Sequence, residues 1–407
     1  MRLAYTIALV LALPFLIARL WWRGRREPAY REGLLERFGI YKTDRPERLV
    51  WLHAVSVGEA RAAEPLVRGL ERALQGHAIL ITCTTAAGRE TLKQVYGESV
   101  LAAYLPYDYP RAVQRFIEHF RPRLGVLMET EVWPNLLAGC QRHQMPVMLA
   151  NARLSERSAR GYERWNALAR PAFEALREVC AQSPEDAERL RRVGAPAVAV
   201  TGNLKFDVTP DARQMQAGRQ WREALGRPVI LLASTRESEE RAFIEVWKPE
   251  VDALLVVVPR HARRFDEVAQ WAQSRRSVAP QPSGDDRVHL GDTMGEMAFY
   301  YSACDVAIIG GSFAPLGGQN LIEALAAGAP VILGPHMFNF AEATRLALQA
   351  GAALQCEDAA AALRAAMALL RDERRRGQMR EAGQQLCARH RGATERHLAV
   401  CRRLLGL

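Results

Sequence analysis

Acidic side chains directly follow two apolar segments of the N-terminal half, where buried parallel strands would end. Glu59 closes the turn AVSVGE after residues 49–53, and Glu129 and Glu131 follow residues 124–128. A carboxylate in the first turn of a helix can take a proton from a bound hydroxyl group. The alternative is a capping role, in which the negative charge of the carboxylate interacts favourably with the dipole at the start of the helix. Neighbouring carboxylates often divide their work, one acting chemically and one orienting, although a solvated loop is the alternative for Glu129 and Glu131.

Basic and glycine-rich sequences at other predicted strand ends have the chemistry of anion sites. Lys205, in GNLKFD, can reach a phosphate or carboxylate as a point charge, although an exposed lysine at a domain junction is commoner. Arg260 follows an apolar segment and can form a phosphate fork. The glycines of GGQNLIE let a phosphate approach backbone N–H groups. Glu323 lies three residues beyond Asn320, on the same helical face, and can accept ribose hydroxyls.

Several classes of protein are disfavoured by what the sequence lacks. It contains neither G-x-G-x-x-G nor a Walker A sequence, which argues against a dehydrogenase and an ATPase. The histidines, cysteines and acids lack metal-ligand spacing, and the seven cysteines stand singly, which favours a reducing compartment over a disulfide framework. The net charge of +10 fits nucleic acid, anionic lipid or an acidic substrate, but aromatic RNA motifs and zinc fingers are missing.

Alternating strand and helix signals must position these residues. A chain of 407 residues is too long for one ordinary core, so two domains are expected. Apolar runs separated by helical stretches predict β-α-β units and parallel sheets. The predicted strands span residues 49–53, 78–82, 124–128, 147–150, 179–181, 197–201, 229–233, 254–258, 306–309 and 331–333.

The polar stretch 206–219 separates the two sets of strands. We therefore predict one domain at 23–205 and a second at 206–407, whose last helices, from residue 359 on, can cross back to the first. Two doubly wound domains in tandem would place a ligand cleft between the carboxyl ends of their sheets.

The first 22 residues are predicted to be a membrane anchor. Residues 3–18 carry no charge, and Trp21, Trp22 and a run of arginines follow. The length is borderline for spanning a bilayer, whereas the aromatic and basic flank is typical of a membrane interface and places the remaining chain in the cytoplasm. A signal peptide lacks its small-residue cleavage site here, and a buried core helix is the other alternative. Whether the segment crosses the bilayer or lies in one leaflet stays open.

Seven short motifs carry a resemblance to a known family. In chain order they are SVGE, ETEVWPN, GNLKFD, STRESEE, PRH, DTMGE and GGQNLIE. This order resembles the 3-deoxy-D-manno-octulosonic acid (Kdo) transferases of lipopolysaccharide synthesis, from the N-terminal segment to about Glu342. The resemblance implies a GT-B fold, in which two Rossmann-like domains face a cleft.

The same resemblance implies an activity, its partners and a location. The chain would transfer Kdo from CMP-Kdo to the lipid A precursor, lipid IVA, with inversion and without a metal or cofactor. It would work on the cytoplasmic side of the inner membrane, with no nucleic-acid partner. A GT-B enzyme that uses a UDP-sugar, a nucleotide-sugar epimerase and a non-catalytic, membrane-tethered nucleotide-sugar binder are the alternatives.

Site residues follow from the resemblance position by position. Glu59 matches the general base, and Glu129, Glu131 and Lys205 match positions near the acceptor and the developing charge, without showing which acid matters more. The segments that match the CMP site contain Pro259, Arg260, Met294, Gly295, Glu296, Asn320, Leu321, Ile322 and Glu323.

Two positions depart from the family pattern. Gln319 stands where histidine is usual, and Ser238 stands where glycine is usual. Glutamine can donate a hydrogen bond but cannot carry a charge, which puts electrostatic help from position 319 in doubt.

Overall fold

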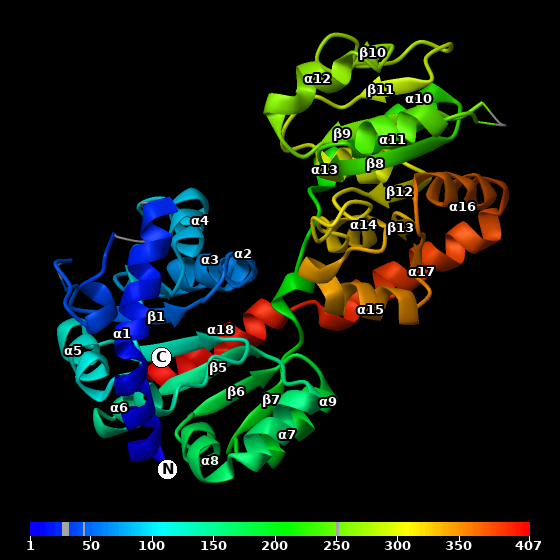
Figure 1. The fold of residues 1–407 in the computed structure, drawn as a ribbon. Helices are drawn as coiled ribbons and strands as arrows, with labels where there is room; N and C mark the ends of the chain where they lie inside the picture. The colour runs from blue at the N-terminus through cyan, green and yellow to red at the C-terminus, as the bar shows by residue number, and fades with distance from the viewer. Residues whose placement is uncertain (27–31, 44, 250–251) are drawn as a thin grey trace. The chain divides into compact units, whose positions relative to one another are not determined.

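The computed structural model describes residues 1–26, 32–43, 45–249 and 252–407, which form two compact units (Figure 1). The first unit contains residues 1–207 and 392–407, and the second contains residues 208–391. Each unit is built on one parallel sheet of seven strands with helices on both faces. This confirms the prediction of two Rossmann-like, doubly wound domains.

The elements of the first unit alternate along the chain. Its strands are β1 (Leu49–His53), β2 (Ala78–Cys83), β3 (Leu101–Tyr104), β4 (Leu124–Met128), β5 (Val147–Ala152), β6 (Glu178–Ala181) and β7 (Val198–Val200). Its helices are α1 (Arg2–Arg26), η2 (Glu36–Phe38), α2 (Val57–Ala62), α3 (Glu64–Ala73), α4 (Ala86–Tyr96), α5 (Pro110–Phe120), α6 (Pro134–Arg142), α7 (Glu156–Arg164), α8 (Asn166–Glu174), α9 (Pro184–Arg192), η3 (Leu204–Phe206) and α18 (Ala393–Leu405).

The second unit repeats the alternation. Its strands are β8 (Val229–Thr235), β9 (Leu254–Pro259), β10 (Ser274–Arg275), β11 (Val288–Leu290), β12 (Val306–Ile309), β13 (Val331–Leu333) and β14 (Ala353–Gln355). Its helices are α10 (Ala212–Leu225), α11 (Glu239–Val246), η4 (Ala262–Arg264), α12 (Phe265–Ala269), α13 (Met297–Ala303), α14 (Ile322–Ala327), η5 (Phe338–Phe340), α15 (Ala341–Gln349), α16 (Ala359–Arg371) and α17 (Glu373–His390).

Both sheets reverse their strand order next to their first strand. The order is β3-β2-β1-β4-β5-β6-β7 in the first unit and β10-β11-β9-β8-β12-β13-β14 in the second. The reversal therefore falls between β1 and β4, whose register pairs Val50 with Leu124, and between β8 and β12, whose register pairs Ile230 with Val306. Ligands of doubly wound sheets bind outside the carboxyl ends of the strands at this switch point.

The first sheet is buried because its strands are apolar on both faces. Trp51 packs with Phe116 of α5 on one face, whereas Val50 and Leu52 belong to the cluster on the other face. That second cluster contains residues of α3, α4 and α18. The last helix, α18, thus completes the core of the first unit although it follows the second unit in sequence (Figure 1).

Helix α1 lies along the first unit, beside α6 (Figure 1). The Tyr109 hydroxyl donates to the carbonyl of Leu9 at 2.7 Å, and Asn135 Nδ2 donates to Thr6 Oγ1 at 3.0 Å. The opposite side of α1 leaves large apolar side chains exposed, among them Leu11 and Phe15. Residues 2–22 are long and apolar enough to cross a membrane, with a mean hydropathy of 2.1.

Two stretches whose composition indicates one helix each, residues 60–75 and 155–177, are interrupted in the structure. The first is broken at Ala63, where Pro65 enters the first turn of α3. The charged stretch 155–177 forms α7 and α8, which meet at Trp165. Strands β3, β10, β11 and β14 were missed because each has only two to four residues, too few for the continuous apolar run by which a buried strand is recognised.

Candidate active site

Glu59 lies at the first switch point, directly after β1. Ser56 caps α2 and accepts a hydrogen bond from the Glu59 N–H at 3.3 Å. The Glu59 carboxylate in turn accepts bonds from the Val55 N–H at 2.8 Å and from the Ser56 hydroxyl at 3.0 Å. This reciprocal arrangement is a variant of the capping box, in which Glu59 bonds the Ser56 hydroxyl and the N–H of the residue before it, so the capping role considered from the sequence is present. Each carboxylate oxygen has a second lone pair, which leaves room for a bound hydroxyl group.

Glu129 lies across the same switch point, directly after β4, in a left-handed backbone conformation with φ of 53°. Its carboxylate is buried, and it meets two cations, Arg153 Nε at 2.9 Å and Lys205 Nζ at 3.5 Å. A non-glycine residue with positive φ is uncommon and is held only where the surroundings require it. The structure thus brings together Glu129 and Lys205, which the sequence places 76 residues apart.

Lys205 is positioned by a buried polar network that sequence reasoning missed. Asn151 Oδ1 accepts from the Leu204 N–H at 3.0 Å, and Asn203 Nδ2 donates to Gln182 Oε1 at 2.8 Å. His397 of α18 accepts from the Asn151 N–H at 2.9 Å. Burial lowers the pKa of His397 to about 4, so the ring is neutral and can accept this bond. No local motif joins these residues, because they come from four separate segments of the chain.

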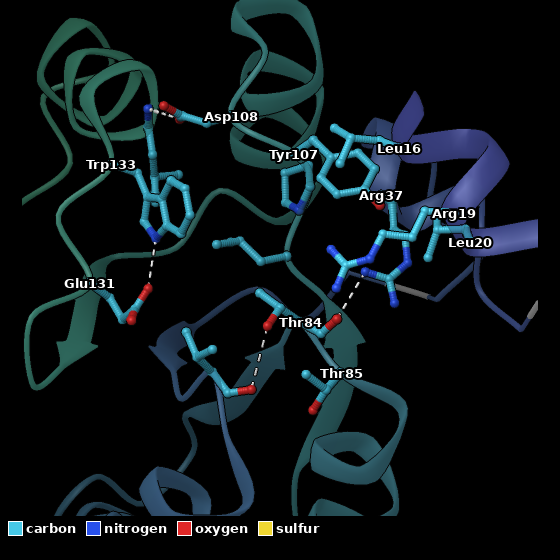
Figure 2. A pocket seen from close by; sticks show the side chains of 14 residues that line it. Leu16, Arg19, Leu20, Arg37, Thr84, Thr85, Tyr107, Asp108, Glu131 and Trp133 are labelled. Carbon is cyan, nitrogen blue, oxygen red and sulfur yellow. Dashed lines mark hydrogen bonds between the residues drawn. The ribbon is translucent and has the colours of Figure 1, made fainter. Parts of the chain in front are cut away.

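Glu131 faces a cavity of about 410 Å³ at the same edge of the first sheet (Figure 2). The Trp133 indole N–H donates to Glu131 Oε2 at 2.9 Å and orients the carboxylate. Val55, which donates to Glu59, also lines this cavity. The cavity therefore adjoins the Glu59 turn.

Burial and like charges shape the titration of this acidic group. Burial, together with the negative charges of Glu129 and Glu131, raises the pKa of Glu59 to about 7 against the lowering effect of the Val55 hydrogen bond. Burial also raises the pKa of Glu131. A general base works best when its pKa lies near the working pH, so Glu59 has the titration that this role requires.

Three candidates for the CMP site in the second unit, Arg260 after β9 and Asn320 and Glu323 after β12, lie close enough to interact. Asn320 Nδ2 donates to Glu323 Oε1 at 2.9 Å, which confirms that these two side chains meet, and Asn320 Oδ1 accepts from the Ile322 N–H at 3.0 Å. Burial raises the pKa of Glu323, while the positive charge of Arg260 opposes this. Pro259, Leu321 and Ile322 are buried, so the side chains of Leu321 and Ile322 belong to the core.

The other residues predicted for the CMP site are Met294, Gly295 and Glu296, and they differ in their contacts. Glu296 pairs with Arg276 through two contacts, at 2.8 and 3.1 Å, and Arg276 holds the pKa of this carboxyl below its usual value. Gly295 takes a left-handed conformation with φ of 82°, and its carbonyl accepts from Gln214 Nε2 at 2.9 Å. Met294 is exposed. Glu296 therefore holds its loop in place, and Met294 is free to contact a ligand.

A buried carboxylate, Glu239, organises the second switch point. Its oxygens accept from the N–H groups of Arg236 at 2.9 Å, Gly311 at 2.6 Å and Phe313 at 3.1 Å. This joins the loop after β8 to the glycine loop after β12. The segment ASTRESEE offers Ser234 or Thr235 as the cap of the next helix by residue type, but α11 begins after Ser238. The glutamates of STRESEE gave no signal that two of them, Glu239 and Glu240, are buried.

Ser238 shows why glycine is usual at this position in the family. Its backbone is left-handed, with φ of 73°, a conformation that costs a residue with Cβ about 1 kcal/mol. Ser238→Gly should raise the free energy of unfolding by about 0.5 to 1 kcal/mol, because it removes this strain at some cost in chain entropy. Chemical denaturation measures the change. A loss of stability would show that Ser238 is held by a contact that compensates the strain.

Comparisons with known proteins agree with this geometry. The family model described as 3-deoxy-D-manno-octulosonic-acid transferase matches residues 32–208, and that of the glycosyl transferases group 1 matches residues 284–386. The 3-deoxy-D-manno-octulosonic acid transferase of Bordetella pertussis is 46% identical over the full length of both chains. The chain belongs to the Kdo transferase family. The Haemophilus influenzae transferase is 35% identical over 98% of this chain and 97% of its own.

A solved structure supports the GT-B fold of this Kdo transferase family member. MurG of Acinetobacter baumannii superimposes with a TM-score of 0.56 over 88% of this chain and all of its own, at 14% identity. This likeness concerns the fold alone. The transferase family model covers Glu59, Glu129, Glu131 and Lys205, so the residues at the first switch point lie inside the matched segment.

Proposed function

We propose that this glycosyltransferase moves Kdo from CMP-Kdo to the lipid A precursor, at the cytoplasmic face of the inner membrane. Family membership supports the transferred sugar. The observation that carries the chemistry is the position of Glu59 at the switch point, with a pKa of about 7 beside two further carboxylates. Helix α1, apolar and exposed along one side, supports a place at the membrane.

The reaction balances with the residues present. Glu59 takes the proton of a primary hydroxyl on the acceptor, and that oxygen forms a bond to the anomeric carbon of Kdo. The bond from this carbon to the phosphate oxygen of CMP breaks with inversion, and CMP leaves with the electron pair. Lys205 and Arg260 would stabilise the negative charge that develops. In the second unit, Asn320 and Glu323 would bind the nucleotide through their polar atoms.

The test combines donor, product and metal requirement in one assay. The full chain is incubated with lipid IVA and CMP-Kdo, with and without EDTA, and the lipid is analysed by mass spectrometry. The expected product carries added Kdo in both conditions. CMP should compete with the donor, and UDP at the same concentration should not.

Two outcomes would contradict the proposal. Inhibition by UDP but not by CMP would indicate a UDP-sugar enzyme. Binding of CMP-Kdo without any gain in lipid mass would indicate a protein that binds nucleotide sugars and catalyses nothing.

A further inference from the structure

The cavity beside Glu131 contains a buried cation without an anionic partner. Arg37 of η2 is 3% exposed and lines this cavity. Its Nη1 donates to the Thr84 carbonyl at 3.0 Å, but Nε and Nη2 are buried and have no hydrogen-bond partner among the residues that the structure describes. A buried charge is costly unless it is paired. The unused donors of Arg37 therefore point to a ligand.

The aromatic contacts of Arg37 hold its guanidinium in place without satisfying it. The group lies 4.0 Å from the ring centre of Tyr104 and 5.9 Å from that of Tyr107. Such stacking orients the planar fork. The Tyr107 side chain also has a hydrogen-bonding interaction with Arg37, but Nε and Nη2 stay without a partner among the described residues. The neighbouring acid Glu36 is unavailable, because it forms a bidentate pair with Arg89 at 3.0 and 3.1 Å.

The cavity has a basic side and an acidic side (Figure 2). Arg37 and Arg19 lie together on one side, next to Leu16 and Leu20 of α1. Glu131 and Trp133 lie on the other side. Asp108 also lines the cavity, but its oxygens accept from the backbone N–H groups of Asn135 and Leu136 at 3.0 and 2.7 Å. An anionic group fits the first side and sugar hydroxyls fit the second.

We propose that this cavity binds the acidic headgroup of the lipid acceptor, with a phosphomonoester of that lipid held by Arg37 and Arg19. The inference deepens the proposed function and rests on it. Helix α1 supplies both Arg19 and the apolar side chains Leu16 and Leu20, so an acyl chain can leave the cavity along the helix that would contact the membrane. The hydroxyls of the same headgroup then lie on the side of Val55 and Glu131, next to Glu59.

Binding is tested first, without any need for transfer. Lysophosphatidic acid, which ends in a phosphomonoester, and lysophosphatidylcholine with the same acyl chain are measured by equilibrium dialysis against the full chain. The native protein should bind the first lipid at least about tenfold more tightly, as expected for a charge-assisted pair. Arg37→Met and Arg19→Met should each remove most of this preference. Equal binding of both lipids by the native chain would overturn the proposal.

Two controls separate binding at the assigned site from a general charge effect and from misfolding. Arg142→Met removes an equal charge from an exposed side chain of the same unit, whose Nε donates to the Ala138 carbonyl of its own helix, and it should retain the preference. Arg37→Met can also fail to fold, because Arg37 is buried, whereas Arg19 is exposed and its removal leaves the core intact. A preference unchanged in Arg19→Met and in a folded Arg37→Met would contradict the assigned site.

Kinetics identify the source of the phosphate. Arg37→Met should raise the KM for the lipid acceptor by roughly 10- to 100-fold, with kcat and the KM for CMP-Kdo retained. The variant and native chains should have the same KM for acceptor that has been treated with phosphatase. An unchanged KM for intact acceptor, together with loss of lysophosphatidic acid binding, would assign the cavity to a bulk phospholipid and overturn the acceptor assignment. Native chain that binds this lipid but transfers nothing would instead overturn the proposed function.

Discussion

Replacement of Glu59 by glutamine should lower kcat for Kdo transfer by roughly 10²- to 10⁴-fold, the usual contribution of a general base. Glutamine keeps the size of the side chain and one carbonyl oxygen, so it can still accept from the Val55 N–H at the start of α2. It cannot take a proton from the acceptor. The affinity for CMP, measured by titration calorimetry, should stay unchanged, because the candidate nucleotide residues lie in the other unit.

The structural role of Glu59 must be separated from its chemical role. Ser56→Ala removes the other half of the capping box and should cost about 1 kcal/mol of stability with most of kcat retained. Glu64→Gln makes the same chemical change in the first turn of α3 and should be close to native in both respects. If Glu59→Gln and Glu64→Gln turned over at similar rates, Glu59 would be a cap and nothing more.

The pH dependence follows from the raised pKa of Glu59. Only the ionised carboxylate can accept the proton, so log kcat/KM, which reports the pKa of the free enzyme, should rise by about one per pH unit below pH 7 and level off above it. Glu131→Gln removes one of the negative charges that raise this pKa, and the acidic limb should therefore move to lower pH. The contribution of Glu59 to the free energy of unfolding changes with pH in the opposite direction. The folded state favours protonated Glu59, so this contribution is complete below pH 4.5 and is lost as the pH rises through 7.

The strand ends could be predicted from sequence, and the contacts between them could not. The apolar runs at 49–53 and 124–128 have the bounds of β1 and β4, because a strand buried on both faces is apolar throughout and ends where polar residues begin. That β1 and β4 are neighbours depends on how the whole chain winds, which no local pattern contains. The contacts that Glu129 makes with Lys205 and Arg153 are consequences of this winding.

The burial of single charged residues was also not predictable from the sequence. Arg37 stands in the sequence LLERFGIY, where nothing distinguishes it from an ordinary exposed arginine. The structure instead pairs Glu36 with Arg89 and buries Arg37 alone. Glu239 likewise looks like one more acid in the first turn of a helix, yet it bonds three backbone N–H groups. Burial of one charged side chain leaves no periodic trace in the sequence.

Lys205→Met should lower kcat by roughly 10²- to 10³-fold, since a preorganised cation beside the developing charge contributes on this scale. Its Nζ lies 3.5 Å from Glu129 Oε1, so loss of the lysine also leaves a buried carboxylate with Arg153 as its remaining cation. The cost in unfolding free energy should be about 1 kcal/mol or less, because the lysine side chain is 27% exposed and the pair is partly screened. Kinetics and chemical denaturation of the same preparation measure the two effects.

A double mutant decides whether Lys205 acts on the substrate or only neutralises Glu129. If Lys205 acts only by neutralising Glu129, the double mutant Lys205→Met/Glu129→Gln contains no uncompensated charge. Its activity should then return towards that of Glu129→Gln alone. If Lys205 stabilises the reacting group, the double mutant should be no faster than Lys205→Met. Arg153→Met is the matched control, because it removes the other cation from Glu129 at 2.9 Å and leaves Lys205 in place. We expect Arg153→Met to stay within about tenfold of native kcat, since its side chain is 52% exposed. An equal loss in both single variants would assign the effect to the charge balance of Glu129.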